Sequence, residues 1–278
     1  MKKPEDDQII PILMYHSISE NAHPLFRKYT ISPIKFREQL SYLFEHNYNP
    51  ITVSQLAKSI HSSTRLPSKP IILTFDDGFY DFYTEAFPVL IDFGFPATIY
   101  ITTKYIDGTS LWLVEEGEGN RPLLDWNHLT EIVCKGIECG GHSHSHAQLD
   151  RLSTDNARNE ITLCKKILED HLNCEISSYA YPYGYYSKSV RQLVKDSGYS
   201  SACAVKNSMN RYSDDLFALK RMIISSDTNY SGYISLLSSR PTIFDRGVRQ
   251  FREIAANFLR RHDIYLRHQK KTKKINRD

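Results

Sequence analysis

The sequence predicts an α/β fold in which strands and helices alternate, and two observations support this prediction. Short apolar runs alternate with amphipathic stretches along most of the chain, which is the pattern typical of β/α proteins. The chain has 278 residues, of which 41% are hydrophobic, so it can bury the core of a single barrel-sized domain.

The individual elements follow from these patterns in chain order. Apolar runs of strand length, bounded by turn residues, predict strands over residues 9–15, 70–75, 97–102, 136–140, 178–181, 201–205 and 221–224. Apolar residues at helical spacing predict helices over residues 34–45, 52–60, 82–93, 125–135, 152–172 and 187–197. Asp125 is expected to cap the helix that it opens. In β/α barrels the active site lies in the loops at the C-terminal ends of the strands, so residues just after these strands are the candidates for chemistry.

Charge is unevenly distributed along the chain. The formal net charge is +3, yet residues 246–278 hold eleven Lys or Arg and three acidic residues, so the remainder is net acidic. We therefore expect a (β/α) barrel domain over residues 1–240 and a basic amphipathic C-terminal helix and tail over residues 241–278. The tail either packs on the barrel or contacts an anionic membrane surface. A nucleic-acid partner is not expected.

The cysteines and the chain start bear on location. The five cysteines form no Cys-x-x-Cys pair, which is unlike a secreted disulfide framework. Five of the first eight residues are charged, and no run approaches the 18 apolar residues of a membrane span. We expect a cytoplasmic protein, peripheral at the inner membrane face if the tail binds lipid.

Two short segments carry the strongest chemical signal. Asp76 and Asp77 follow the strand at 70–75, and His142 and His146 follow the strand at 136–140. A hydrolase that activates water on a divalent metal needs about three protein ligands and a separate base. One aspartate can join the two histidines on the metal while the other serves as the base. Read singly, Asp76-Asp77-Gly78 is more typical of a turn or a helix cap, whereas His142 and His146 are equally typical of surface histidines on a polar loop.

The spacing of the histidines and the next strand end add two expectations. His142 and His146 would share one face if their segment is helical, and His144 between them would then point away. Imidazole and carboxylate ligands favour zinc or another late divalent ion. The segment 181–184, Tyr-Pro-Tyr-Gly, is either a rigid turn or a loop whose backbone N–H binds an oxyanion.

In order, the segments 13–18, 72–78, 96–98, 141–146 and 180–184 resemble the motifs of polysaccharide deacetylases of the NodB-homology type. The Tyr-His near the start and the Tyr-Pro-Tyr-Gly motif are similar to the poly-N-acetylglucosamine deacetylase subgroup. This resemblance implies a distorted (β/α) barrel of about seven strands. It also implies metal-dependent removal of N-acetyl groups from an amino-sugar-containing glycan or glycoconjugate.

The resemblance also implies roles for individual residues. Asp77, His142 and His146 would hold the divalent metal, with Zn²⁺ favoured and Co²⁺ or Ni²⁺ as alternatives. Asp76 would be the general base that activates metal-bound water. The backbone N–H of Tyr183 would hold the oxyanion.

The sequence departs from the family pattern in two places. Ala180 stands where many members have an arginine that braces the catalytic aspartate; Arg221, on a late strand, either replaces it at Asp76 or is an ordinary surface arginine. The usual late Leu-x-His that supplies a general acid is not evident. His16, at a strand end, is the candidate proton donor, and return of the proton by Asp76 is the alternative.

The function expected from these residues is N-deacetylation of an N-acetylated glycan or a lipid-linked sugar. Two alternatives stay open: a carbohydrate-binding pseudoenzyme and a related hydrolase of non-sugar amides.

Overall fold

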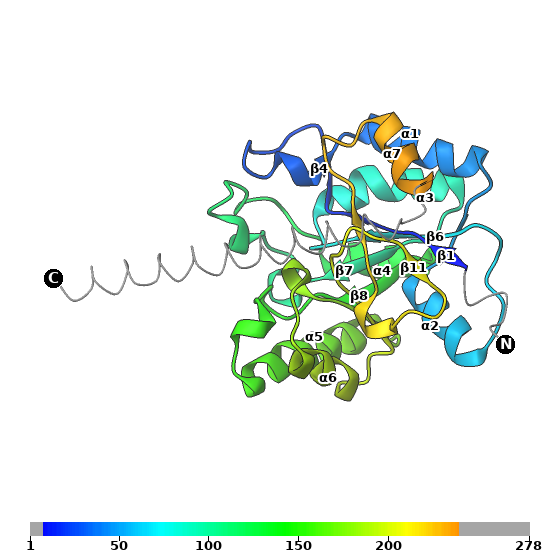
Figure 1. Cartoon of the computed structure of the whole chain (residues 1–278). Coiled ribbons are helices and arrows are strands. Elements are labelled where there is room, and N and C mark those ends of the chain that lie inside the picture. The colour runs from blue at the N-terminus through cyan, green and yellow to red at the C-terminus, as the bar shows by residue number, and fades with distance from the viewer. Residues whose placement is uncertain (1–7, 239–278) are drawn as a thin grey trace. The chain divides into compact units, whose positions relative to one another are not determined.

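The computed structural model describes residues 8–238. They form a curved parallel sheet with helices packed around it (Figure 1). Along the sheet the strand order is β10-β9-β8-β7-β6-β2-β12, and β5 pairs with β6 outside this path. The predicted fold class, a distorted (β/α) barrel, is confirmed.

The strands of this sheet are short and mostly buried. Their bounds are β2 Ile12–Tyr15, β5 Asn49–Pro50, β6 Pro70–Phe75, β7 Thr98–Ile101, β8 Glu138–Gly141, β9 Ser178–Ala180, β10 Ser201–Cys203 and β12 Met222–Ile223. All their pairings are parallel. The C-terminal ends of the strands therefore lie along one rim.

Two small sheets flank the main one. β1 (Ile9–Ile10) pairs antiparallel with β11 (Asn210–Arg211), and β3 (Ser17–Ile18) pairs with β4 (Thr30–Ile31). The expected single strand over residues 9–15 is thus divided at Pro11, which has no N–H to donate to a sheet. Before this proline the chain pairs with β11, and after it with β6 and β12.

The segment before β12 bridges the two ends of the sheet. Leu219 exchanges backbone hydrogen bonds with β10 and the residue after it: its N–H donates to Ala202 and its carbonyl accepts from Ala204, at 3.0 and 2.7 Å. β12 then pairs with β2 at the other end of the strand order. This closure brings Arg221 into the barrel interior, where its side chain is 0% exposed.

Helices cover the sheet in two groups, with α1, α3 and α7 together in one group and α5 and α6 in another (Figure 1). The α-helices are α1 Pro33–Glu45, α2 Val53–Ser62, α3 Phe87–Phe93, α4 Trp126–Cys134, α5 Thr154–Leu172, α6 Lys188–Asp196 and α7 Tyr230–Ser238. The short 3₁₀ helices are η2 Arg27–Tyr29, η4 Thr103–Tyr105, η5 Leu111–Leu113, η6 Leu149–Arg151, η7 Pro182–Gly184 and η8 Leu216–Ala218.

Side-chain caps explain where most of the longer helices begin. Asp125 accepts a hydrogen bond from the backbone N–H of His128, so the predicted cap of α4 is confirmed. The equivalent caps of α1, α2, α5 and α6 are Ser32, Thr52, Ser153 and Ser187. The expected helix over residues 82–93 instead starts as a π-helix, η3 (Phe82–Ala86), before α3 continues it.

Backbone contacts divide the chain after Leu237. The expected basic helix and tail over residues 241–278 lie outside the described residues. Within residues 8–238, no helix is long and apolar enough to cross a membrane.

Small residues let the strand that precedes the histidine segment pack closely. A Cβ added at Gly140 would lie 2.5 Å from the Tyr100 ring, and one at Gly141 would lie 2.4 Å from the Tyr199 hydroxyl. Both distances are shorter than any van der Waals contact. β8 can therefore approach its neighbours only because these positions carry no side chain.

We predict that Gly140→Ala lowers the free energy of unfolding by about 1–3 kcal/mol, because the Tyr100 ring must move to admit the methyl group. Denaturant unfolding of the purified protein measures this. Gly232→Ala in α7, where the nearest atom is the end of the Asn229 side chain at 3.1 Å, is the control and should change stability by less than about 1 kcal/mol. Equal effects of the two substitutions would contradict the packing argument.

Candidate metal centre

The four residues with the strongest chemical signal meet at one rim of the sheet. Asp76 and Asp77 follow β6, and His142 follows β8 directly, with His146 four residues later. β7 separates these two parallel strands, so their C-terminal loops are close neighbours. All four residues are buried, with exposed fractions of 7% or less.

Asp77, His142 and His146 form a cluster that suits a metal ion. One donor atom from each lies within 4.8 Å of the other two. The Oδ1 atom of Asp77 is 3.5 Å from Nε2 of His142 and 3.2 Å from Nε2 of His146. Bonds of 2.0–2.1 Å to a tetrahedral zinc would place ligand atoms about 3.3 Å apart.

The hydrogen bonding of the cluster supports the same interpretation. Asp77 Oδ1 is covered and makes no hydrogen bond of acceptable geometry within the described structure, although the two imidazoles adjoin it. Nδ1 of His142 lies 2.8 Å from the carbonyl oxygen of Ala180. Because a carbonyl can only accept, Nδ1 carries the proton and Nε2 keeps its lone pair for a metal. The donor set therefore fits a divalent cation.

The histidine segment is a loop, so the idea that a helical face aligns His142 and His146 is wrong. Ser143 and His146 adopt positive φ angles of 63° and 57°, which break any helix there. Glu160 of α5 holds this loop by accepting from both the N–H and the hydroxyl of Ser145, each at 2.7 Å. His144 turns away to Thr103, with 3.0 Å between Nδ1 and Oγ1.

Asp76 lies beside the cluster and is gripped by Arg221. Nη1 of Arg221 is 2.5 Å from Oδ1, and Nη2 is 2.7 Å from Oδ2. The guanidinium also reaches the Ala204 carbonyl and the Thr74 hydroxyl, both at 3.3 Å. This two-pronged contact uses the fork geometry that distinguishes arginine from lysine.

The charges at the rim keep both carboxylates ionised. Burial alone would raise the pKa of Asp76, but the charges of Arg221, His142 and His16 together outweigh it, and the net pKa lies below the ordinary value. Burial likewise opposes ionisation of Asp77, and there His146 and His142 lower the pKa well below its usual range. Both groups are therefore able to accept a proton or a metal at neutral pH.

His16 belongs to the same rim, between β2 and β3. Its ring centroid is 5.0 Å from that of Tyr29, and its Nδ1 atom is covered and unpartnered within residues 8–238. Burial lowers the pKa of His16, although the nearby charges of Asp77 and Asp76 act in the opposite direction. In this environment the neutral ring is favoured before a substrate binds.

Tyr183 lies beside His146 and has a strained backbone conformation. Its φ of 59° lies in the left-handed region, which is costly for a residue other than glycine. Its ring, 51% exposed, meets the His146 ring edge-on with 4.7 Å between centroids.

Trp112, on the short helix η5, has a contact for which the sequence gives no signal. It stacks on His146 with 5.0 Å between centroids and 24° between planes. Nδ1 of His146 has no hydrogen-bond partner in the described part of the chain, unlike Nδ1 of His142. Ring packing by Trp112 and Tyr183 therefore fixes the orientation of His146 in place of a hydrogen bond.

Comparison with known proteins identifies the family. The sequence pattern described as polysaccharide deacetylase matches residues 63–202, half of the chain. The chain belongs to the polysaccharide deacetylase family. The protein YxkH of Bacillus subtilis (strain 168) is 24% identical over 237 residues, covering 85% of this chain and 79% of YxkH. The poly-beta-1,6-N-acetyl-D-glucosamine N-deacetylase of Staphylococcus epidermidis is 23% identical over 210 residues, covering 72% of this chain and 70% of that enzyme.

A solved structure of a polysaccharide deacetylase is similar to most of this chain. BC0361, a polysaccharide deacetylase from Bacillus cereus, superposes with a TM-score of 0.71 at 26% identity. The match covers 84% of this chain and 70% of that one. The overall architecture is thus shared with a protein of the same family.

We predict that Trp112→Ala weakens zinc binding about 10- to 100-fold, the usual cost of losing a group that orients a metal ligand. Competition with a chromogenic chelator measures the affinity without any need for turnover. Trp126→Ala is the matched control, because Trp126 stacks on His171, which is not a member of the metal cluster, at 4.0 Å. Zinc affinity unchanged in Trp112→Ala would show that the stacking does not orient His146.

Proposed function

We propose that this protein is a metal-dependent hydrolase that removes N-acetyl groups from an amino-sugar-containing glycan. The observation that carries the proposal is the convergence of two ionised aspartates and two histidines at one rim of the barrel. One aspartate is placed with the histidines and the other beside them. A metal-dependent hydrolase needs metal ligands and a separate base, and this arrangement provides residues for each.

The relatives support the substrate class. The Staphylococcus epidermidis relative is named a poly-beta-1,6-N-acetyl-D-glucosamine N-deacetylase, and relatives in Escherichia coli carry the same name. An N-acetylated glucosamine polymer is therefore the substrate to test first.

Asp77, His142 and His146 are proposed to hold the divalent cation. Their oxygen and nitrogen donors suit zinc, and cobalt or nickel would bind similar ligands. When bound, such a cation lowers the pKa of a coordinated water to about 7 and polarises a carbonyl oxygen.

Asp76 is proposed as the general base, with Arg221 as the residue that positions it. Each carboxylate oxygen has two lone pairs, and Arg221 occupies one on each oxygen. A lone pair thus stays free to accept the proton of the attacking water. Rigid pairing also prevents the carboxylate from turning away from the cluster.

Tyr183 and His16 are proposed to handle the remaining charge and proton. The backbone N–H of Tyr183 would donate to the oxyanion as the acetyl carbon becomes tetrahedral. His16, in its protonated form, would donate a proton to the departing amine. The alternative donor is Asp76, which carries the proton taken from water.

The cellular setting is a separate proposal from the sequence. A cytoplasmic location, a lipid-linked substrate and contact of residues 241–278 with anionic membrane stay predictions, because those residues lie outside the described structure.

We predict that Asp76→Asn lowers acetate release from N-acetylglucosamine oligomers by about 10²–10⁴-fold and leaves zinc bound, because an amide cannot accept the proton. His142→Ala should lose both zinc and activity. The measurement is acetate release by purified protein, metal-free and reconstituted with zinc, cobalt or nickel.

Two outcomes of this experiment would contradict the proposal. If metal binds through His142 but no oligomer releases acetate, the substrate class is wrong, and non-sugar amides become the next substrates to test. If no metal binds at all, the deacetylase proposal is wrong, and the protein is better described as a carbohydrate-binding pseudoenzyme.

We predict that His16→Gln lowers kcat by about 10²-fold or more with little change in zinc affinity, because a proton donor to the amine is lost. His144→Gln is the matched control, since His144 contacts Thr103 and lies outside the cluster. A wild-type kcat in His16→Gln would contradict the role of His16 and leave Asp76 as the proton donor.

A further inference from the structure

The loop that contains Trp112 is attached to the segment that contains the two aspartates. This loop, residues 106–124, connects η4 to α4 and includes η5. At its end the N–H of Leu124 donates to the carbonyl of Gly78, directly after Asp77, at 2.9 Å. Such a bond fixes the end of the loop, but η5 lies further along the chain. The position of η5 therefore depends on side-chain contacts.

Arg121, in the same loop, joins it to two other segments of the rim. Its Nη1 donates to Oδ2 of Asp81 and to the hydroxyl of Ser17, both at 2.9 Å. Ser17 directly follows His16, and Asp81 precedes the π-helix η3. The side chains of Arg121 and Asp81 are 10% and 13% exposed. Because little water reaches this ion pair, its attraction is weakly screened.

The remaining donors of Arg121 reach its own loop and the segment after β3. Nε donates to Oε2 of Glu118, and Nη2 donates to the carbonyl of Asn21, each at 3.1 Å. The guanidinium also lies over two rings, with its carbon 5.4 Å from the centroid of Phe26 and 5.6 Å from that of Phe79. Only an arginine offers both a fork of donors and a flat face for such rings.

A line of stacked rings connects Arg121 to a metal ligand. Phe79, which the guanidinium covers, is 6.5 Å from the Trp112 ring, with 25° between the planes. Trp112 in turn stacks on His146 at 5.0 Å. Phe79 belongs to a buried apolar cluster with Phe26, Leu113 and Leu123. A change at Arg121 is thus transmitted to His146 through packed side chains.

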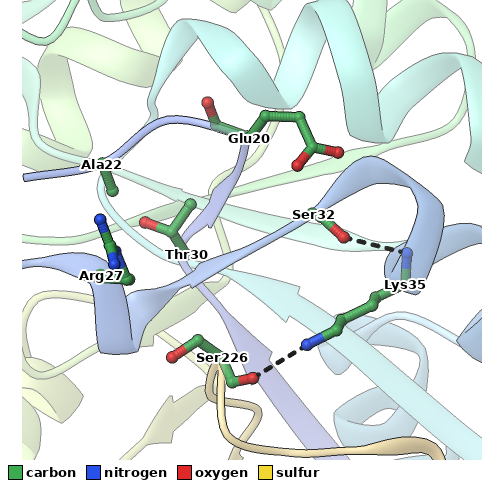
Figure 2. A pocket seen from close by; sticks show the side chains of 8 residues that line it. Glu20, Ala22, Arg27, Thr30, Ser32, Lys35 and Ser226 are labelled. Carbon is green, nitrogen blue, oxygen red and sulfur yellow. Dashed lines mark hydrogen bonds between the residues drawn. The ribbon is translucent and has the colours of Figure 1, made fainter.

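The segment after β3 has open space along part of its surface. Glu20 and Ala22, on either side of Asn21 in the chain, line an open pocket (Figure 2). The bonds of this segment toward the loop are the contact of the Asn21 carbonyl with the guanidinium and the donation of the His23 N–H to Glu118. Arg121 and Glu118 therefore fix this segment on the side away from the pocket.

We propose that Arg121 and Asp81 are a positioning pair for the metal centre: they hold the loop so that Trp112 stacks on His146, and they fix the chain beside the proposed proton donor. Neither residue belongs to the metal cluster, so both act through other side chains. The catalytic part of this role rests on the proposed function, whereas the contact of Trp112 with His146 does not.

Both members of the pair are charged at about pH 8, where the experiments are done. Burial raises the pKa of Asp81 to about 6, although Ser17 and Arg121 act in the opposite direction. Removing one partner of a buried pair leaves the other charge uncompensated. A neutral substitution on either side therefore tests the pair.

The first arm of the test follows Trp112 by fluorescence in the metal-free full chain. The chain has two tryptophans, so Trp126→Phe leaves Trp112 as the single emitter. In that background Arg121→Met should shift the emission to longer wavelength and increase quenching by acrylamide, because the ring loses its fixed contacts with Phe79 and His146. Unchanged emission and quenching would overturn the proposal.

The second arm measures zinc affinity by competition with a chelator. Arg121→Met should weaken zinc binding about tenfold, the low end of the range for groups that orient a metal ligand. Added to Trp112→Ala, it should weaken binding no further than Trp112→Ala alone, because both changes remove the same stacking on His146. Losses that multiply in the double variant would show that Arg121 does not act through Trp112.

Three further variants separate positioning from folding. Arg37→Met removes an arginine from an ion pair with Asp92, between α1 and α3, and should change neither measurement. Asp81→Asn keeps the shape and should reproduce the effects of Arg121→Met, so the test remains decisive if the methionine variant does not fold. Wild-type behaviour of Asp81→Asn would overturn the assignment of the pair. Arg121→Lys, which keeps the charge but not the fork, should restore part of the zinc affinity.

The third arm compares kcat and KM for acetate release from N-acetylglucosamine oligomers. Arg121→Met should lower kcat about tenfold and leave KM within about twofold, since a buried positioning residue does not bind the substrate. A change confined to KM would show that Arg121 contacts the substrate, against the proposal. Absence of deacetylation in every protein, including the wild type, would count against the proposed function alone, because the fluorescence arm needs neither turnover nor metal.

Discussion

The buried ion pair between Arg221 and Asp76 is the contact on which the rest of the site depends. Arg221 is 0% exposed and reaches the carboxylate by two hydrogen bonds across 145 residues of sequence. Removing one partner would leave a buried charge unpaired, which costs about 3–5 kcal/mol. Because the segment around Arg221 also joins β10 to β12, closure of the barrel fixes the position of Asp76.

The residues of the candidate metal centre depend on local backbone strain that the surrounding structure must hold. Asp77, Ser143, His146 and Tyr183 all adopt positive φ angles, a conformation that L-residues rarely take. Glu160 holds the histidine loop, Ala180 orients His142, and Trp112 packs on His146. The strain places donor atoms at the rim where a relaxed turn would direct them elsewhere.

The departure at Ala180 shows how one requirement can be met from a different strand. Many members of the family place an arginine there to brace the aspartate, whereas here Arg221 enters from the segment before β12. Ala180 keeps a role through its carbonyl, which accepts from His142.

The sequence by itself determined the alternation of strands and helices, the Asp125 cap, and the order in which polar segments follow strands. These depend on periodicity and local propensity, which act over a few residues, and parallel strands then bring Asp76, Asp77, His142 and His146 to one rim. Only the tertiary structure decided the partner of Arg221, the non-helical histidine loop and the stacking of Trp112. It also decided that residues between Ser19 and Lys35 line one open pocket together with Ser226. Such contacts join residues far apart in the chain, and their geometry is set by how the barrel closes, which no local pattern encodes.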